Sequence, residues 1–230
     1  MKKYIYILIT LFSLSLSAQE LFWYDVLLEV EGEDITEFEK TVDAYYSSVD
    51  FPEDVTMTFS SIGLKGQGFE ETHILSFVSP SSQSLANLRA SLSGEKWENY
   101  LDLVRPLVDN VRVSAGNASK VFNAEEFYPI GQVWGFKVKS KYIPQFTVAF
   151  EKLMQIFDAP GFVGLANVTH GISNGENLLI YGTYPDLNSA FTFGPNNEAE
   201  AGAFAEFFNI TGEISEFTQS WTRVKIQDYN

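Results

Sequence analysis

The sequence predicts an α+β fold in which a unit of order strand, helix, strand, strand, helix, strand occurs twice along the chain. Two observations predict it. The segments "LSFVSPSSQSLANL" and "LIYGTYPDLNSAF" share the order of an apolar strand, a proline and a helix start, and two earlier helical stripes share their apolar spacing. A single continuous domain with another topology is the alternative.

The first unit begins with a strand in which Phe22, Tyr24 and Val26 alternate with other residues. Asp34 and Glu37 then have the spacing of a helix-capping pair. The apolar stripe of the helix follows at steps of three and four, and comprises Ile35, Phe38, Val42, Tyr45 and Val49. The remaining expected elements are strands over 55–64, 72–78 and 111–114, and helical segments that begin at Ser81 and end before Pro106.

The second unit repeats this order. Its first strand is expected over 132–140, and its helical stripe comprises Ile143, Phe146, Phe150, Leu153 and Phe157. Alignment of Phe38 with Phe146 places Val42 on Phe150, so the two stripes have the same period. The remaining expected elements are strands over 162–170, 178–184 and 219–226, and helical segments over 186–193 and 198–208.

The N-terminus has the pattern of a secretory signal. Lys2 and Lys3 precede an apolar run that ends at Leu16, and Ala18 closes a segment of small residues. A bilayer requires about 20 apolar residues, so a retained anchor is the weaker interpretation. We expect a signal peptide over 1–18, a first repeat over 19–116, a linker over 117–129 and a second repeat over 130–230, in a periplasmic or secreted protein.

Composition excludes several classes of function. The chain has 15 Lys and Arg against 30 Asp and Glu, a net charge of −15, which disfavours binding to nucleic acid or to an anionic membrane surface. It has no cysteine, so lipoprotein anchoring, disulfides and thiolate chemistry are excluded. A Gly-x-Ser-x-Gly elbow is absent, and "GLKGQGF" lacks the Lys-Ser/Thr ending of a phosphate loop.

The predicted β-α-β-β-α-β order is the ferredoxin-like pattern. The segments "SFVSPSSQSLANL" and "SGEKWENYLDLVRPLVDNVRV", with "EFEK" and "QFTVAFEKL" in the two early helices, resemble the dimeric α+β barrel superfamily of the antibiotic-monooxygenase-like kind. The resemblance covers nearly all of the mature chain as a pattern and brings no catalytic motif. It implies that two four-stranded sheets close on each other as a barrel with a cavity, here as tandem repeats within one chain.

The two histidines, His73 and His170, each lie beside a predicted hairpin. No His-x-His or His-x-x-x-His spacing occurs, so the sequence predicts no metal site and no cofactor. Haem held by one histidine and a transition-metal site remain alternatives to an imidazole that flanks a turn.

Aromatic residues are abundant, with 20 Phe, 11 Tyr and 4 Trp. A pocket of rings with few polar groups is typical of a small-molecule site. The candidate ligand-binding residues are Trp134, Asn167, His170, Tyr181 and Trp221.

The function that these patterns favour is an exported protein that binds a small apolar or aromatic ligand in an aromatic-lined barrel cavity. The alternative is a cofactor-independent oxygenase or isomerase, with His170, His73, Asp25 or Glu29 as the base. A scaffold that self-associates through sheet faces or edges is a third hypothesis. The sequence alone does not decide whether the protein is an enzyme.

Overall fold

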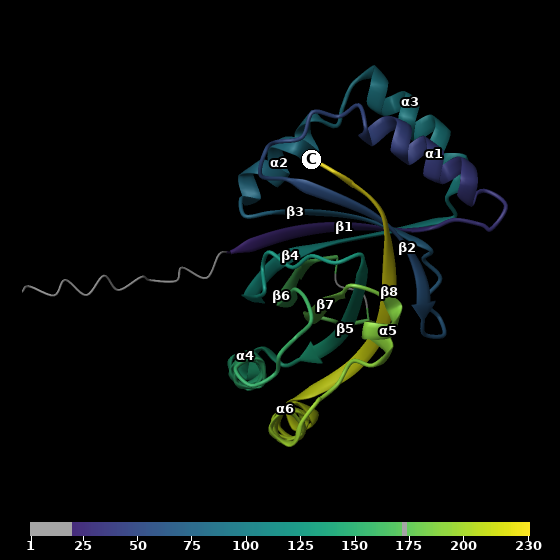
Figure 1. Cartoon of the computed structure of the whole chain (residues 1–230). Helices are drawn as coiled ribbons and strands as arrows, with labels where there is room; N and C mark the ends of the chain where they lie inside the picture. The colour runs from purple at the N-terminus through teal and green to yellow at the C-terminus, as the bar shows by residue number, and fades with distance from the viewer. Residues whose placement is uncertain (1–19, 172–173) are drawn as a thin grey trace, which may run out of the picture.

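The computed structural model describes residues 20–171 and 174–230, and the signal peptide expected over 1–18 lies outside these residues. In this part of the chain, eight strands form a closed antiparallel barrel. Helices pack on two opposite sides of its outer surface, as Figure 1 shows. None of the described helices is both long enough and apolar enough to cross a membrane.

The N-terminal half contains four strands, three α-helices and one short 3-10 helix. In chain order they are β1 (Leu21–Glu29), α1 (Ile35–Tyr46), β2 (Thr56–Lys65), β3 (His73–Ser79), α2 (Ser82–Ser91), α3 (Glu95–Val104), η1 (Arg105–Leu107) and β4 (Asn110–Phe122).

The C-terminal half has the same order of strands and main helices. Its elements are β5 (Ile130–Val138), η2 (Ser140–Tyr142), α4 (Ile143–Met154), β6 (Val163–His170), β7 (Leu178–Tyr184), α5 (Leu187–Phe191), α6 (Glu198–Ile214) and β8 (Ser215–Tyr229).

The barrel closes in the strand order β1-β3-β2-β8-β5-β7-β6-β4. The strands of the N-terminal half are therefore neighbours in the order β4-β1-β3-β2, and those of the C-terminal half in the order β6-β7-β5-β8. The two halves join where β2 pairs with β8 and where β4 pairs with β6. Both seams are antiparallel and continuous with the sheets on either side.

Two strands are longer than the sequence pattern predicts. The expected strand over 111–114 is β4, which continues to Phe122, so the first part of the expected linker over 117–129 is strand. The expected strand over 219–226 is β8, which runs from Ser215 to Tyr229. Each of these strands pairs with one neighbour from its own half and one from the other half, and the two pairings are offset along the strand, which accounts for its length.

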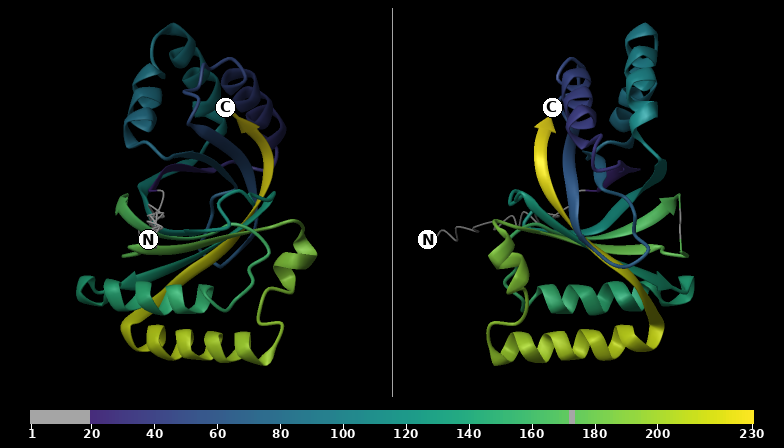
Figure 2. Two further views of the ribbon diagram at one scale, coloured as in Figure 1. Left: turned by 60° about the vertical axis from the view of Figure 1, so that its left-hand side comes forward. Right: turned by 90° about the vertical axis from the view of Figure 1, so that its right-hand side faces the viewer.

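The main apolar cores lie between the barrel and its helices. The predicted helical stripes are confirmed: Phe38 and Val42 of α1, and Phe146 and Phe150 of α4, are at most 1% exposed. Figure 2 shows α1, α2 and α3 on one side of the barrel, and α4 and α6 on the other. Each helical layer therefore buries the outer face of one half of the barrel.

Alternation along the strands separates this outer face from the barrel interior. On β1, Tyr24 and Leu28 pack toward the helices of the N-terminal half. The intervening residues Trp23, Asp25 and Leu27 line spaces inside the barrel. Because successive side chains of a strand point to opposite faces, the same division continues around the barrel. The interior is thus a separate environment, and it contains both rings and charged groups.

Candidate functional site

The barrel interior contains a cavity of about 630 Å³, a volume that includes its open mouth. Aromatic side chains from three strands line it: Trp23 of β1, Tyr181 of β7 and Trp221 of β8. Two small residues, Ala118 of β4 and Ala166 of β6, line the same cavity, and their short side chains leave part of it unfilled.

Further spaces adjoin this cavity on either side. One shares Leu21, Phe127 and Tyr181 with it, and Phe127 is 45% exposed, so the cavity meets solvent at this end. The other shares Asp25 and Trp221 with the cavity. The cavity therefore lies between an open end of the barrel and a second, more polar end.

A chain of four polar side chains crosses the cavity wall. The Ser76 hydroxyl donates a hydrogen bond to Asp25 Oδ1 at 2.6 Å. Arg223 Nη1 donates to Ser76 Oγ at 2.7 Å. Arg223 Nη2 and Nε donate to the Tyr181 hydroxyl at 2.7 and 3.1 Å, and the guanidinium also lies over the Tyr181 ring. The chain connects β1, β3, β8 and β7, strands that come from both halves of the molecule.

Strand register explains how these residues meet. Asp25 of β1 is the direct partner of Ser76 on β3, so their side chains leave the sheet side by side. Arg223 of β8 is the direct partner of Gly131 on β5. A Cβ at Gly131 would overlap the Tyr181 hydroxyl and lie 2.9 Å from Arg223 Nε. Glycine at position 131 therefore provides the space in which tyrosine and arginine make contact.

Burial changes the acidity of Asp25. Desolvation raises the pKa of this carboxyl from 3.8 to about 6, and the Ser76 hydrogen bond and the positive charge of Arg223 oppose the rise. The side chain keeps some accessible surface because it lines the cavity. Asp25 is therefore a carboxyl that changes protonation near neutral pH inside an aromatic-lined space, which is typical of functional sites.

One donor in the cavity wall has no partner among the described residues. The indole Nε1 of Trp23 is buried and makes no hydrogen bond there. A buried N–H without an acceptor costs about 1–3 kcal/mol. The Trp23 side chain also lines the cavity.

The polar end of the barrel carries a second group of charges. Arg112 of β4 pairs with Glu71 at 2.9 Å. Glu176 is buried there and accepts a hydrogen bond from Gln219 of β8. Desolvation raises the pKa of Glu176, while the positive charge of Arg112 and the hydrogen bonds that Glu176 accepts act to lower this pKa. Arg112 and Glu176 line the same space as Asp25, on the side of Asp25 away from the solvent-facing mouth.

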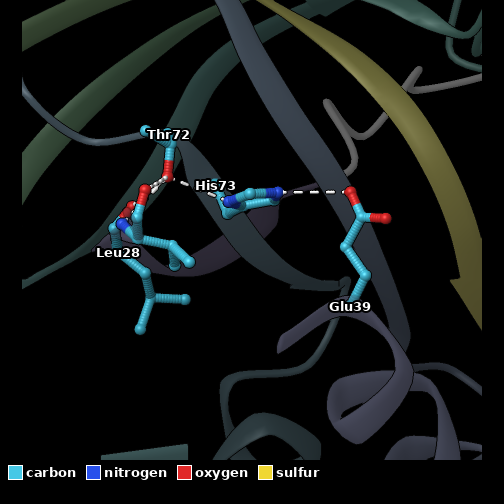
Figure 3. Close-up of polar contacts among 5 residues, drawn as sticks. Leu28, Glu39, Thr72 and His73 are labelled. Atoms are coloured by element: carbon cyan, nitrogen blue, oxygen red, sulfur yellow. Dashed lines mark hydrogen bonds and ion pairs between the residues drawn. The ribbon is translucent and has the colours of Figure 1, made fainter. Parts of the chain in front are cut away.

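His73 does not belong to the cavity. It lies on the outer face of β3, between the rings of Phe38 and Phe59. Figure 3 shows its imidazole between Thr72 and Glu39: Nδ1 is 2.9 Å from Thr72 Oγ1, and Nε2 is 3.4 Å from Glu39 Oε1. Burial lowers the pKa of His73, although the Glu39 carboxylate acts to raise it. This histidine is a core residue of the helical side.

The predicted ligand-binding residues lie in different environments. Tyr181 and Trp221 line the cavity. Trp134 packs in the outer core against Phe193, and Asn167 of β6 lies beside Asn117 at 3.5 Å. His170 is exposed at the end of β6, where Nδ1 is 3.0 Å from Thr169 Oγ1. The structure therefore brings together two of the five, and ligand contact by any of them stays a prediction.

Of the four candidate bases, only Asp25 lines the cavity. Glu29 lies at the end of β1, where desolvation and nearby acidic groups raise its pKa. Neither histidine is among the residues that line the interior spaces. Within residues 20–171 and 174–230, no group of three His, Asp or Glu side chains has the arrangement of a metal site.

Trp23, Ser76 and Arg223 are site residues that are not among the candidates predicted from the sequence. Asp25 stands in "LFWYDVLLEV", where a charged residue interrupts an apolar run. Arg223 stands in "SWTRVKI", which also contains Lys225, so local composition does not single it out. A charge at the centre of an otherwise apolar strand is a signal of a polar group within the fold, because buried charges are rare without a partner.

No protein-family model matches the chain, and no curated protein matches its sequence. Solved structures match its fold. A "Putative monooxygenase" from Fusobacterium nucleatum superposes with a TM-score of 0.64 at 12% identity, over 92% of this chain and 94% of that one. A "putative monooxygenase" from Lactobacillus acidophilus has a TM-score of 0.62 at 11% identity, over 91% and 96%. An anthrone oxidase-like protein has a TM-score of 0.61 at 10% identity, over 92% and 93%.

These similarities confirm the resemblance to the dimeric α+β barrel superfamily at the level of the fold. The structure is a mixed α+β fold with a closed eight-stranded antiparallel barrel. At such low identity the likeness extends to the fold alone, and the function has to be argued from the site.

Proposed function

We propose that this protein is exported and binds a small, largely apolar molecule inside the barrel. The observation that carries the proposal is the interior cavity, in which Trp23, Tyr181 and Trp221 provide apolar walls and Asp25 and Arg223 provide polar groups. Rings that bury most of a ligand, together with a few directional polar groups, are the usual composition of a specific small-molecule site.

The proposal includes an origin for the cavity. We interpret the halves as tandem ferredoxin-like repeats that act as a dimer within one chain. The shared order of elements and the matching order of strand neighbours in each half support this interpretation. Each half has helices on one face of its sheet, and the other face is covered by the other half.

Export is the second part of the proposal. It rests on Lys2 and Lys3, the apolar run that ends at Leu16, and Ala18 at the expected cleavage position. N-terminal sequencing of the protein recovered from the periplasm or medium of an expressing bacterium tests it. Cleavage after Ala18 is the expected result, and an uncleaved cytoplasmic product would contradict export.

A cavity-filling substitution tests the binding site. Ala166→Phe places a ring in the cavity, and Ala205→Phe places one on the exposed surface of α6. We expect small aromatic compounds to raise the melting temperature of the wild type and of Ala205→Phe, but not that of a folded Ala166→Phe protein. Equal stabilisation of all three proteins would place binding outside the barrel.

Asp25 supports a second function, that of a cofactor-independent oxygenase or isomerase. The carboxyl lines the cavity and has a pKa of about 6, so it is suited to accept a proton from a bound substrate near neutral pH. Of the three solved structures described above, two are named as monooxygenases and one as an anthrone oxidase-like protein. Under this hypothesis Asp25→Asn still binds the substrate but no longer converts it. Equal rates of substrate conversion by the wild type and the variant would show that Asp25 is not the base.

A further inference from the structure

Arg223 is a buried cation whose hydrogen-bond partners in the described chain are all neutral. It is 7% exposed and donates to Ser76 and Tyr181, both hydroxyl groups. Arg223 is connected to Asp25 only through the Ser76 hydroxyl, which accepts from Arg223 and donates to Asp25. A buried guanidinium ordinarily pairs with a carboxylate, because its desolvation is costly. The cavity wall therefore presents a positive charge that no carboxylate of the described residues contacts directly.

Arginine donates hydrogen bonds and accepts none. A ligand group complementary to Arg223 is one that only accepts, and a carboxylate is such a group. The remaining wall, which includes Trp221, Ala118 and Ala166, suits an apolar body.

Asp25 determines when the positive charge is available. It is the carboxyl nearest to Arg223 along the hydrogen-bond chain, and it lines the same cavity. When Asp25 is ionised, its charge opposes an incoming anion and offsets Arg223. When Asp25 is protonated, the cavity has a net positive charge. Tyr181 also faces this space, and Arg112 and Glu176 face the adjoining polar space, where Arg112 is paired with Glu71. The space at the open end, which Arg223 also lines, is faced by four further groups: Asp54, Tyr128, and the ion pair of Lys225 and Asp228.

We infer that the ligand is an apolar molecule with one carboxylate, which binds at Arg223 and is taken up together with a proton that binds to Asp25. The inference rests on the proposed function, since it names the chemical class of the ligand of the same cavity. The proton comes from solvent and stays on the Asp25 carboxyl while the ligand is bound, so the pair Arg223 and ligand carboxylate is electrically neutral.

The experiment compares two probes of the same shape, 2-naphthoate and 2-naphthamide, with benzoate and benzamide as a smaller pair. Binding to the purified protein is measured by calorimetry between pH 5 and 8. We expect the carboxylates to bind at least about 10-fold more tightly than the amides at pH 5.5. Above the pKa of Asp25, about 6, the affinity for carboxylate falls about 10-fold per pH unit because the proton must be supplied.

Variants separate the roles of the groups. In Asp25→Asn the affinity for 2-naphthoate is expected to be independent of pH, while the control Glu29→Gln, on the same strand, keeps the wild-type profile. Arg223→Met abolishes the preference for carboxylate and Arg223→Lys retains part of it. Should Arg223→Met fail to fold, Arg223→Lys still tests the site, because it keeps the positive charge but loses the planar fork of donors, and it is expected to bind 2-naphthoate about 3- to 10-fold more weakly than the wild type.

Proton uptake gives a measurement that is independent of affinity. Calorimetry at pH 7.5 in two buffers of different ionisation enthalpy reports the protons taken up per ligand, and close to one is expected for the wild type and none for Asp25→Asn. Equal affinity for carboxylate and amide would overturn the inference and leave the cavity as a binding site. A carboxylate preference without proton uptake would overturn the role of Asp25. No binding of either pair would contradict the proposed function itself.

Discussion

Replacement of Asp25 by asparagine is expected to stabilise the protein at neutral pH. Asparagine has nearly the same shape and keeps an oxygen that accepts the Ser76 hydrogen bond, but it carries no charge. The wild-type carboxyl has a folded pKa of about 6 against an ordinary value of 3.8. Between these values the folded protein holds a proton that the unfolded chain has released. The stability of the wild type therefore falls as the pH rises from about 4 to about 6.

The size of the effect follows from the same two values. Each unit of difference between the folded and unfolded pKa corresponds to about 1.4 kcal/mol. The free energy of unfolding of the wild type therefore falls by up to about 3 kcal/mol between about pH 4 and pH 6. This is the largest value expected, since Asp25 faces the cavity and is partly solvated there. Asp25→Asn should be more stable than the wild type by up to about 3 kcal/mol at pH 7.5 and equal to it at pH 3.5.

Urea unfolding of both proteins at closely spaced pH values measures this difference. Other groups titrate in the same range, but they are common to both proteins and cancel in the subtraction. Asp50→Asn, at an exposed position, is the control and should change the free energy of unfolding little at any pH. A difference between wild type and Asp25→Asn that is constant with pH, or that favours the wild type at pH 7.5, would refute the reasoning.

Further substitutions test the packing and the burial of His73. Phe146→Ala, at a position with no exposed surface, should lower the free energy of unfolding by about 3–5 kcal/mol in urea, while Val148→Ala on the exposed side of α4 changes it by less than about 0.5 kcal/mol. Gly131→Ala should cost about 1–3 kcal/mol because its methyl group overlaps the cavity wall, whereas Gly202→Ala in α6, with open space around it, should gain about 1 kcal/mol in the same assay. Burial lowers the pKa of His73 from 6.5, so the wild type should lose stability relative to His73→Phe as the pH falls below 6.5, and a pH-independent difference would contradict this.

Local sequence period predicted the outer layers of the fold well. The stripes that contain Phe38 and Phe146 have the spacing of amphipathic helices, and both residues are buried as that spacing implies. The lengths of β4 and β8 could not be predicted in this way. Their ends are fixed by pairing with strands more than 40 positions away in the sequence, and local alternation contains no information about such partners.

The site was harder to predict because both faces of the strands carry rings. Trp23 faces the cavity and Tyr24 faces the helices, yet the two are adjacent and similar in the sequence. Trp134 was selected as a candidate ligand contact and lies in the outer core, while its neighbour Val133 lines the cavity. An assignment that is shifted by one residue exchanges the two faces completely. The charge of Asp25 within an apolar run is the sequence signal for the inner face, and its hydrogen-bond partner Ser76 lies on that face.

The distribution of buried groups explains how the barrel can hold a polar chain without losing its stability. Four phenylalanines with almost no exposed surface, Phe38, Phe59, Phe146 and Phe150, belong to the two cores between helices and barrel. Each such ring contributes several kcal/mol through burial, and the cores hold the strands in register from outside. The interior contains smaller apolar clusters, which include Trp221 and Trp23, and polar groups occupy the rest of its wall. It can retain a buried guanidinium, an unsatisfied indole N–H and a carboxyl of raised pKa, all of which reduce stability, and a complementary ligand would satisfy the guanidinium.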